Sequence, residues 1–266
     1  MDKLLICICF HYIEDRFRYL DVLMDRFLNE YTSRFNVTVI VDTNSKQGEM
    51  RLRERYPDDR VGIFRHDRLA HPFHLTWMHR YHISLHKDEY DFFMYVEDDM
   101  DIPLENFVRY LENFRIVWPR GVPVFLRVEE KDGVRYNSDA ERREPVRHLE
   151  ILKDREFVTE MMHPLPYHAF WICPGDVLRS IMPPDFVKCS ISRETAASFL
   201  IWEMRKKGYL QWEDGNVSRK CLAYHLPNNY ACDPHTRLGK IPLDNVFFID
   251  KRDDDTRAKD DRSTDD

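Results

Sequence analysis

The chain has 266 residues, of which 43% are hydrophobic and 33% are charged, and its formal net charge is −7. This is the composition of a globular protein that can bury a substantial core. The negative balance argues against a nucleic-acid binder that relies on a basic surface. No apolar run approaches the ~20 residues that span a bilayer, so no transmembrane segment is expected.

The six cysteines are spread along the chain, and none forms a Cys-x-x-Cys pair. A zinc ribbon or a thioredoxin-type site is therefore not indicated, and free cysteines fit a reducing compartment. The first apolar run, residues 4–10, is short and soon followed by charged residues, unlike a secretory signal. We therefore expect a cytoplasmic protein.

The N-terminal region has the pattern of a strand, a helix and a second strand. Strands are predicted over 3–10 and 37–41, and the helical spacing of apolar residues predicts a helix over 17–31. Asp42 follows the second strand, where nucleotide-binding folds hold a ribose with an acid. A turn-forming Asp is the commoner alternative. No Gly-x-Gly-x-x-Gly follows the first strand, so a dinucleotide is not indicated.

A short helix over 51–56 and a third strand over 61–65 come next, followed by a histidine-rich segment that leads into a helix running towards Lys87. His82 and His86 are one helical turn apart, so they could grip a metal ion. No His-Glu-x-x-His pattern and no third ligand accompany them, which favours surface or packing histidines.

The segment Asp91–Val96 is predicted to be a buried strand, and four of the five residues that follow it, 97–101, are carboxylates. Pro103 then opens a helix that ends near Trp118. Open α/β sheets bind ligands at the carboxyl ends of such strands. Crowded carboxylates repel one another and need a cation, and oxygen ligands suit Mg²⁺ or Mn²⁺ shared with phosphates. The alternative is a solvated acidic turn beside a helix N-terminus.

In the second half, a strand is predicted over 122–128 and a charged excursion over 129–157. A strand over 167–173 and a short helix opened by Pro174 follow. Ser192 is expected to cap a helix that extends to Lys207 and ends at Gly208. A last strand covers 222–227, and residues 250–266 have the composition of a disordered tail. The organisation expected is one domain over 1–249 with that acidic tail.

This ordered set of features resembles the GT-A family of nucleotide-sugar glycosyltransferases over roughly residues 3–240. Glu97-Asp98-Asp99 looks like that family's DXD motif, in the Glu-Asp-Asp form of the N-acetylglucosaminyltransferases that branch N-glycans. The segment from Glu194 to Tyr209 is similar to the later helix that carries the catalytic base of inverting members. Here a single acid stands where the usual motif has two.

The resemblance implies an α/β fold with a central, mostly parallel mixed sheet, and a role for each motif residue. Asp99, Asp101 and His225 would hold Mn²⁺ or Mg²⁺, and Glu194 would be the catalytic base. Nucleotide-sugar contacts would come from His11, Asp42, Glu97, Asp98, Arg237 and Lys240. For Arg237 and Lys240 ordinary solvated charge is the stronger alternative, and for Glu194 a helix-dipole acid is nearly as good an explanation. In the register Asp99-x-Asp101, Glu97 and Asp98 contact ribose or sugar instead of the ion.

The function expected is transfer of a sugar from a nucleotide diphosphate sugar, with UDP favoured, to a glycan, glycoprotein or other hydroxyl acceptor, with inversion. Two alternatives stay open. A nucleotidyltransferase also uses metal-held acids, although the loop over 11–15 lacks the glycines of a phosphate loop. A non-catalytic sugar- or protein-binding module could keep the same fold.

Overall fold

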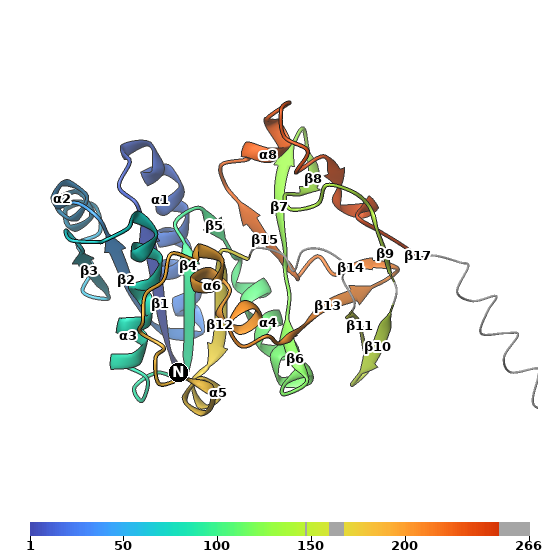
Figure 1. Ribbon diagram of the computed structural model, residues 1–266, viewed down its shortest axis with the longest axis horizontal. Coiled ribbons are helices and arrows are strands. Elements are labelled where there is room, and N and C mark those ends of the chain that lie inside the picture. Colours follow the sequence, from blue (N-terminus) through green and yellow to red (C-terminus); the bar gives the residue numbers. More distant parts are fainter. Residues whose placement is uncertain (147, 160–167, 250–266) are drawn as a thin grey trace, which may run out of the picture.

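The computed structural model describes residues 1–146, 148–159 and 168–249, so the expected tail at 250–266 lies outside the described residues. It has a five-stranded sheet with helices around it, and further sheets built from shorter strands between residues 100 and 249 (Figure 1). This confirms the α/β class with a mostly parallel mixed central sheet. Among the described residues, no helix has the length and apolar character needed to cross a membrane.

Four strands of the central sheet, β1 (Asp2–Phe10), β2 (Phe35–Thr43), β4 (Phe92–Glu97) and β12 (Phe170–Pro174), are largely buried. In spatial order the strands of this sheet are β12, β4, β1, β2 and β3 (Val61–Arg65). All neighbours are parallel except β12, which runs antiparallel to β4. Every residue of β4 is buried, as the continuous apolar run requires for a strand covered on both faces. Because β1, β2 and β4 are parallel, their carboxyl ends lie at the same edge of the sheet.

Helices and short helical turns connect and flank the strands. The helices are α1 (Phe17–Asp25), α2 (Lys46–Arg55), α3 (His79–Leu85), α4 (Leu104–Val117), α5 (Gly175–Ile181), α6 (Arg193–Ala197), α7 (Phe199–Trp202) and α8 (Asn229–Cys232). The turns are η1 (Glu14–Arg16), η2 (Arg26–Glu30), η3 (Tyr31–Ser33), η4 (Pro72–Trp77) and η5 (Leu243–Asn245). Pro103 stands at the N-cap of α4, one residue before the first helical position at which it was expected. The expected helix over 17–31 is present as α1 continued by η2 and η3.

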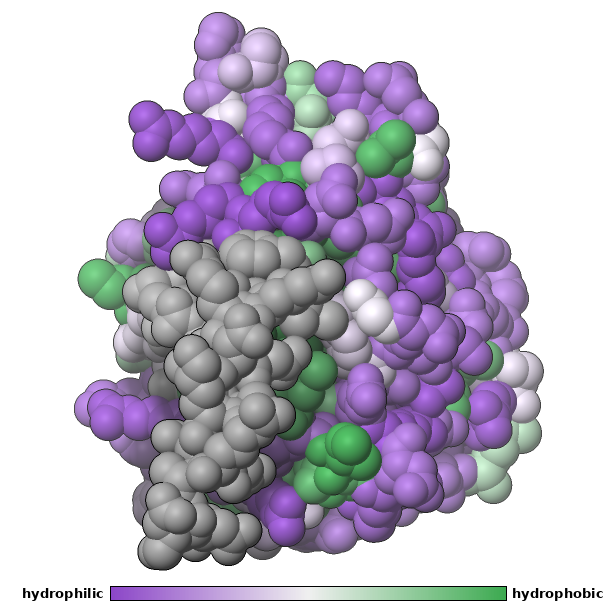
Figure 2. All heavy atoms as spheres, turned by 90° about the vertical axis from the view of Figure 1, so that its right-hand side faces the viewer, coloured by the Kyte–Doolittle hydropathy of each residue, from purple (hydrophilic) through white to green (hydrophobic). Residues whose placement is uncertain are grey.

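Three smaller sheets form the right-hand part of Figure 1. One contains β10 (Leu149–Leu152), β11 (Arg155–Val158), β13 (Lys207–Glu213) and β14 (Asn216–Val217), with β6 (Gly121–Pro123) beside β13. Another contains β16 (Ile241–Pro242), β8 (Val134–Asn137), β7 (Leu126–Lys131), β15 (Leu222–His225) and β5 (Met100–Asp101). The third pairs β17 (Phe247–Ile249) with β9 (Glu144–Val146). The exposed face at this end is largely hydrophilic where Figure 2 shows described residues.

Several predicted elements differ from the structure. The helix expected to extend from Ser192 to Lys207 is wrong: α6 ends before Ser198, where φ is −143°, α7 is short, and Gly208 lies inside β13. Tertiary pairing explains this, because residues 207–209 pair with β6 and residues 210–212 pair with β11. The strand expected over 122–128 is divided into β6 and β7, which join different sheets.

The pairing of β5 with β15 is what brings the two halves of the chain together at the acidic turn. Met100 lies opposite His225 and Asp101 lies opposite Tyr224. The backbone N–H of Leu226 also donates to the carbonyl of Asp99 at 3.0 Å. The carboxyl end of β15 is thereby held beside the turn that leaves β4.

Candidate active site

The acidic motif forms the turn between β4 and β5, at the carboxyl end of the central strand. Glu97 is the last residue of β4, Asp98 and Asp99 form the turn, and Asp101 lies on β5. All four residues are buried, with between 4% and 7% of their surface exposed. A buried carboxylate needs a positive partner or hydrogen-bond donors to offset its lost hydration.

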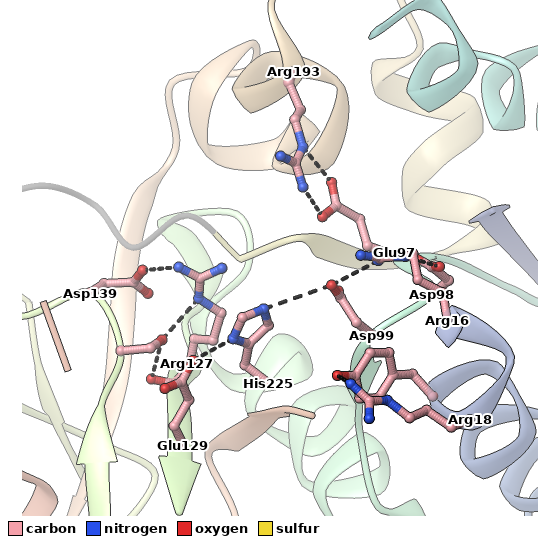
Figure 3. A network of polar contacts seen from close by, with 12 residues as sticks. Arg16, Arg18, Glu97, Asp98, Asp99, Arg127, Glu129, Asp139, Arg193 and His225 are labelled. Carbon is pink, nitrogen blue, oxygen red and sulfur yellow. Dashed lines mark hydrogen bonds and ion pairs between the residues drawn. The ribbon is translucent and has the colours of Figure 1, made fainter. Parts of the chain in front are cut away.

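The partners of these acids are arginines. Arg16, in η1 after β1, donates from Nε to Asp98 Oδ2 at 2.7 Å and from a terminal nitrogen to Asp99 Oδ2 at 2.8 Å. Arg193, on α6, binds both oxygens of Glu97, and its Nε donates at 3.0 Å. Figure 3 shows both guanidinium groups facing the turn. The need for a cation is thus met within the chain, so the expectation of mutually repulsive, unpaired acids is wrong.

Asp101 belongs to a separate ion pair. Arg26 binds both of its oxygens, with a distance of 2.8 Å to Oδ2, and also pairs with Glu30. Among the described residues, no hydrogen bond or ion pair joins the Asp101 side chain to Asp99 or His225. Of the three residues expected to hold a metal ion, the structure brings only Asp99 and His225 together.

Asp99 and His225 face each other across the junction of β5 and β15. His225 Nε2 lies 3.7 Å from Asp99 Oδ2, and the opposite ring nitrogen, Nδ1, is hydrogen-bonded to Glu129 Oε1 (Figure 3). The second oxygen of Glu129 accepts from the backbone N–H of Ala231 at 2.6 Å. A carboxylate that holds one ring nitrogen fixes the orientation of the other, as in histidines that bind metals.

The pKa values of the two aspartates in the turn are shifted in opposite directions. Burial raises the pKa of Asp98, and although Arg16 opposes this, the neighbouring Asp99 adds to it. Burial also acts to raise the pKa of Asp99, but His225 and Arg16 outweigh it, so that this pKa is lowered. For His225, burial opposes the charged form, yet Asp99 and Glu129 raise its pKa above the ordinary value. Asp99 is therefore the carboxylate of the pair that stays ionised.

Three of the residues expected to contact the nucleotide sugar lie in or near the turn, and a fourth does not. Glu97 and Asp98 are in the turn itself. His11 follows β1 and is half-buried. Burial lowers its pKa, Arg16 and Arg193 lower it further, and Glu97 opposes this change. Asp42 is instead buried at the end of β2 with 1% of its surface exposed, and its Oδ1 contacts His66 and His82. A ribose could reach it only by displacing a histidine.

The remaining expected residues are exposed. Glu194 lies in the first turn of α6, next to Arg193, and Ser192 Oγ donates to it at 3.4 Å. Ser192 also caps that turn, as predicted. The Lys240 ammonium donates to the carbonyls of Tyr230 and Asp233, both at 2.6 Å, so it closes the C-terminal end of α8. Arg237 is exposed in the loop between α8 and β16.

The residues missed by the sequence analysis are the partners: Arg16, Arg193, Arg26 and Glu129. The sequence signal for Arg16 is its position shortly after the first predicted strand. In the structure, Cys9 near the end of that strand lies opposite Glu97 in the parallel register. Arg193 is adjacent to the expected Glu194. Glu129 was hidden in a charged, poorly periodic segment, and only the pairing of β7 with β15 places it beside His225.

The comparisons with known proteins find similarity among solved structures. No protein-family model matches the chain, and no curated protein matches it. Among solved structures it is similar to a mannosyltransferase from Pyrobaculum calidifontis in complex with GDP-mannose and Mn²⁺, with 10% identity and a TM-score of 0.41. The match covers 85% of this chain but only 57% of that one. Such a distant likeness assigns neither a function nor a ligand.

Proposed function

We propose that this protein is a metal-dependent glycosyltransferase of the GT-A type. It would transfer a sugar from a nucleotide diphosphate sugar, with UDP as the preferred nucleotide, to a hydroxyl of a glycan or glycoprotein. The transfer would invert the anomeric configuration. The observation that carries the proposal is the facing pair of Asp99 and His225 at the carboxyl end of the central parallel strand, where open α/β sheets bind their ligands.

The donor atoms of this pair fit a divalent ion. Asp99 Oδ2 and His225 Nε2 are 3.7 Å apart, a separation that two ligands about 2.1 Å from one ion can span. Glu129 holds the histidine so that Nε2 faces the carboxylate, which is the outer-shell arrangement of metal-binding histidines. A bound Mn²⁺ or Mg²⁺ would neutralise the charge of the departing diphosphate.

The arginines of the site support binding of a diphosphate. Arg16 now neutralises Asp98 and Asp99, and a divalent ion on Asp99 would take over part of that role. The guanidinium of Arg16 would then be available to a phosphate, for which its paired N–H donors are well suited. Glu97, Asp98 and His11 are proposed as contacts to the ribose or sugar, because they lie around the same turn.

Glu194 is proposed as the base that removes the proton of the acceptor hydroxyl. Its neighbour Arg193 reaches Glu97, which ties the beginning of α6 to the acidic turn. The Glu194 carboxylate is exposed, so an acceptor can approach it from solvent. Attack on the anomeric carbon from the side opposite the diphosphate inverts the configuration. For Arg237, exposed on the loop before β16, we propose a contact to the phosphates only when that loop closes.

The test is calorimetric titration of UDP into the protein with Mn²⁺ and with EDTA. UDP should bind with Mn²⁺ and lose its affinity in EDTA, and Asp99→Ala should abolish the metal-dependent part. The matched control is Asp91→Ala: Asp91 lies at the opposite end of the same strand and accepts a hydrogen bond from the backbone of Lys3 at 2.8 Å. Nucleotide affinity that is the same in Asp99→Ala and wild type would overturn the metal assignment.

One observation favours a second candidate, a non-catalytic sugar- or protein-binding module. Glu97, Asp98, Asp99 and Asp101 are all paired with arginine, so the acids are neutralised without a metal ion. Such a module would show no metal-dependent nucleotide affinity. Screening nucleotide sugars for slow donor hydrolysis would complete the distinction, because only an enzyme releases the nucleoside diphosphate.

A further inference from the structure

A second group of buried ionisable side chains lies at the same edge of the central sheet, away from the acidic turn. Asp42 is the next-to-last residue of β2, His66 follows β3 directly, and His82 lies on α3. Their side chains are 1%, 22% and 4% exposed. The three elements converge because β2 and β3 pair in parallel up to Arg65, and the N–H of His66 donates to the carbonyl of Thr43 at 2.9 Å.

Both imidazoles point the same ring nitrogen at one carboxylate oxygen. His66 Nε2 lies 2.7 Å and His82 Nε2 lies 2.9 Å from Asp42 Oδ1. One ligand atom from each of the three residues lies within 4.8 Å of the other two. Asp42 Oδ2 is buried with no hydrogen-bond partner among the described residues. A buried carboxylate oxygen without a partner is costly, so hydrogen bonding alone leaves this group incomplete.

We propose that Asp42, His66 and His82 form a binding site for a first-row transition metal ion such as Zn²⁺. Ligand atoms bound about 2.0–2.1 Å from zinc in a tetrahedron lie roughly 3.3 Å apart. The observed separations of 2.7 and 2.9 Å become metal–ligand geometry when each imidazole moves outward by a few tenths of an ångström. The ion replaces the two N–H donors and gives the carboxylate a full positive partner.

The donor set selects this ion over the one proposed for the acidic turn. Two imidazoles and one carboxylate suit Zn²⁺ and its neighbours, whereas Mg²⁺ and Mn²⁺ prefer oxygen ligands. Three protein ligands also leave one coordination position open. His66 borders a surface cavity of about 430 Å³ that is lined by His74 and Cys189 as well. The cavity provides a path for the ion and a source of water for the fourth position.

The experiment is titration of the reduced protein with Co²⁺, a spectroscopic substitute for Zn²⁺, in excess Mg²⁺ so that oxygen-only sites are occupied. Wild type should bind one equivalent and develop the intense visible bands of four-coordinate Co²⁺, and Zn²⁺ should abolish them. His66→Gln and Asp42→Asn should lose these bands. Their affinity should fall by more than the roughly 10–100-fold that loss of an outer-shell partner costs.

Two controls separate this site from others. His86→Gln changes the histidine at the end of the same helix, whose Nδ1 lies 3.2 Å from Glu89 rather than near Asp42, and it should keep the bands. Asp99→Asn should also keep them, even if nucleotide binding is lost, so the two proposals can fail independently.

Folding is checked by circular dichroism. His66→Gln is the most informative variant, because its side chain is the most exposed of the three. Zn²⁺ should raise the melting temperature of wild type and leave that of His66→Gln unchanged. The proposal is overturned by wild type that shows no four-coordinate bands, by His66→Gln that binds Co²⁺ like wild type, or by thiolate charge-transfer bands that place the ion on cysteine.

Discussion

Two clusters that contain buried acids lie at the same edge of the central sheet, and their acids are neutralised in different ways. The acids at the end of β4 are held by guanidinium groups, whereas Asp42, near the end of β2, is held by two imidazoles. Arginine keeps its proton in proteins and has no lone pair to offer a metal, but neutral histidine has one. The first cluster must therefore release an arginine to accept a metal ion, whereas the second already contains metal ligands.

The largest effect is expected from the residue that would make the first cluster catalytic. Glu194→Gln keeps the size of the side chain but removes the base, so turnover should fall by about 10²–10⁴-fold with little change in donor affinity. Glu105→Gln is the matched control, since Glu105 is an exposed acid in the first turn of α4. The readouts are initial rate and proton NMR of the fresh product. Near-normal turnover would reduce Glu194 to a helix-end acid, and retained configuration would contradict inversion.

A second variant tests whether a metal ion and the guanidinium of Arg16 compete for Asp99 in the first cluster. Arg16→Met leaves Asp98 and Asp99 without their main partner. Breaking a buried pair costs roughly 3–5 kcal/mol, and we expect the low end because 28% of the Arg16 side chain is exposed. Mn²⁺ should restore more stability to this variant than to wild type, as measured by urea unfolding.

The control for that variant is Arg18→Met, because the guanidinium of Arg18 contacts the neighbouring Tyr19 rather than an acid. It should change the free energy of unfolding little. Equal stabilisation of Arg16→Met and wild type by Mn²⁺ would show that the ion does not compete with the guanidinium for Asp99.

The smallest effect concerns the buried imidazole of His168. His168 stacks on Phe170, its Nε2 has no partner among the described residues, and burial, reinforced by Arg127, lowers its pKa to about 3 from 6.5. The folded state holds the ring neutral, so stability present above pH 6.5 is lost as pH falls towards 3. Between pH 7 and 5 this loss is about 2 kcal/mol, at 1.36 kcal/mol per pKa unit.

His168→Phe should therefore unfold with less dependence on pH below 6.5 than wild type, with equal or greater stability at pH 7.5. The measurement is the urea midpoint as a function of pH. Identical pH profiles for the variant and wild type would mean that His168 is protonated in the folded state.

The sequence predicted the parts of the site that depend on local patterns. The apolar run before Glu97, the acids that follow it and the proline before α4 are contiguous, so strand, turn and helix could be recognised together. The strands around 3–10 and 37–41 were predicted for the same reason. The helix over 192–207 failed because α6 and α7 are interrupted at Ser198 and β13 takes its backbone hydrogen bonds from other strands. Helical spacing of apolar residues does not reveal such pairing.

The local sequence is sufficient to predict that a buried strand ends in a crowded group of carboxylates that requires a cation. The identity of the cation beside each acid depends on the tertiary structure. Arg16 lies 82 residues from Asp98, Arg193 lies 96 residues from Glu97, and His82 lies 40 residues from Asp42. Their meeting depends on strand order and register, which bring the ends of distant strands to one edge. Local composition carries no record of that order, because the same residues in another topology would pair differently.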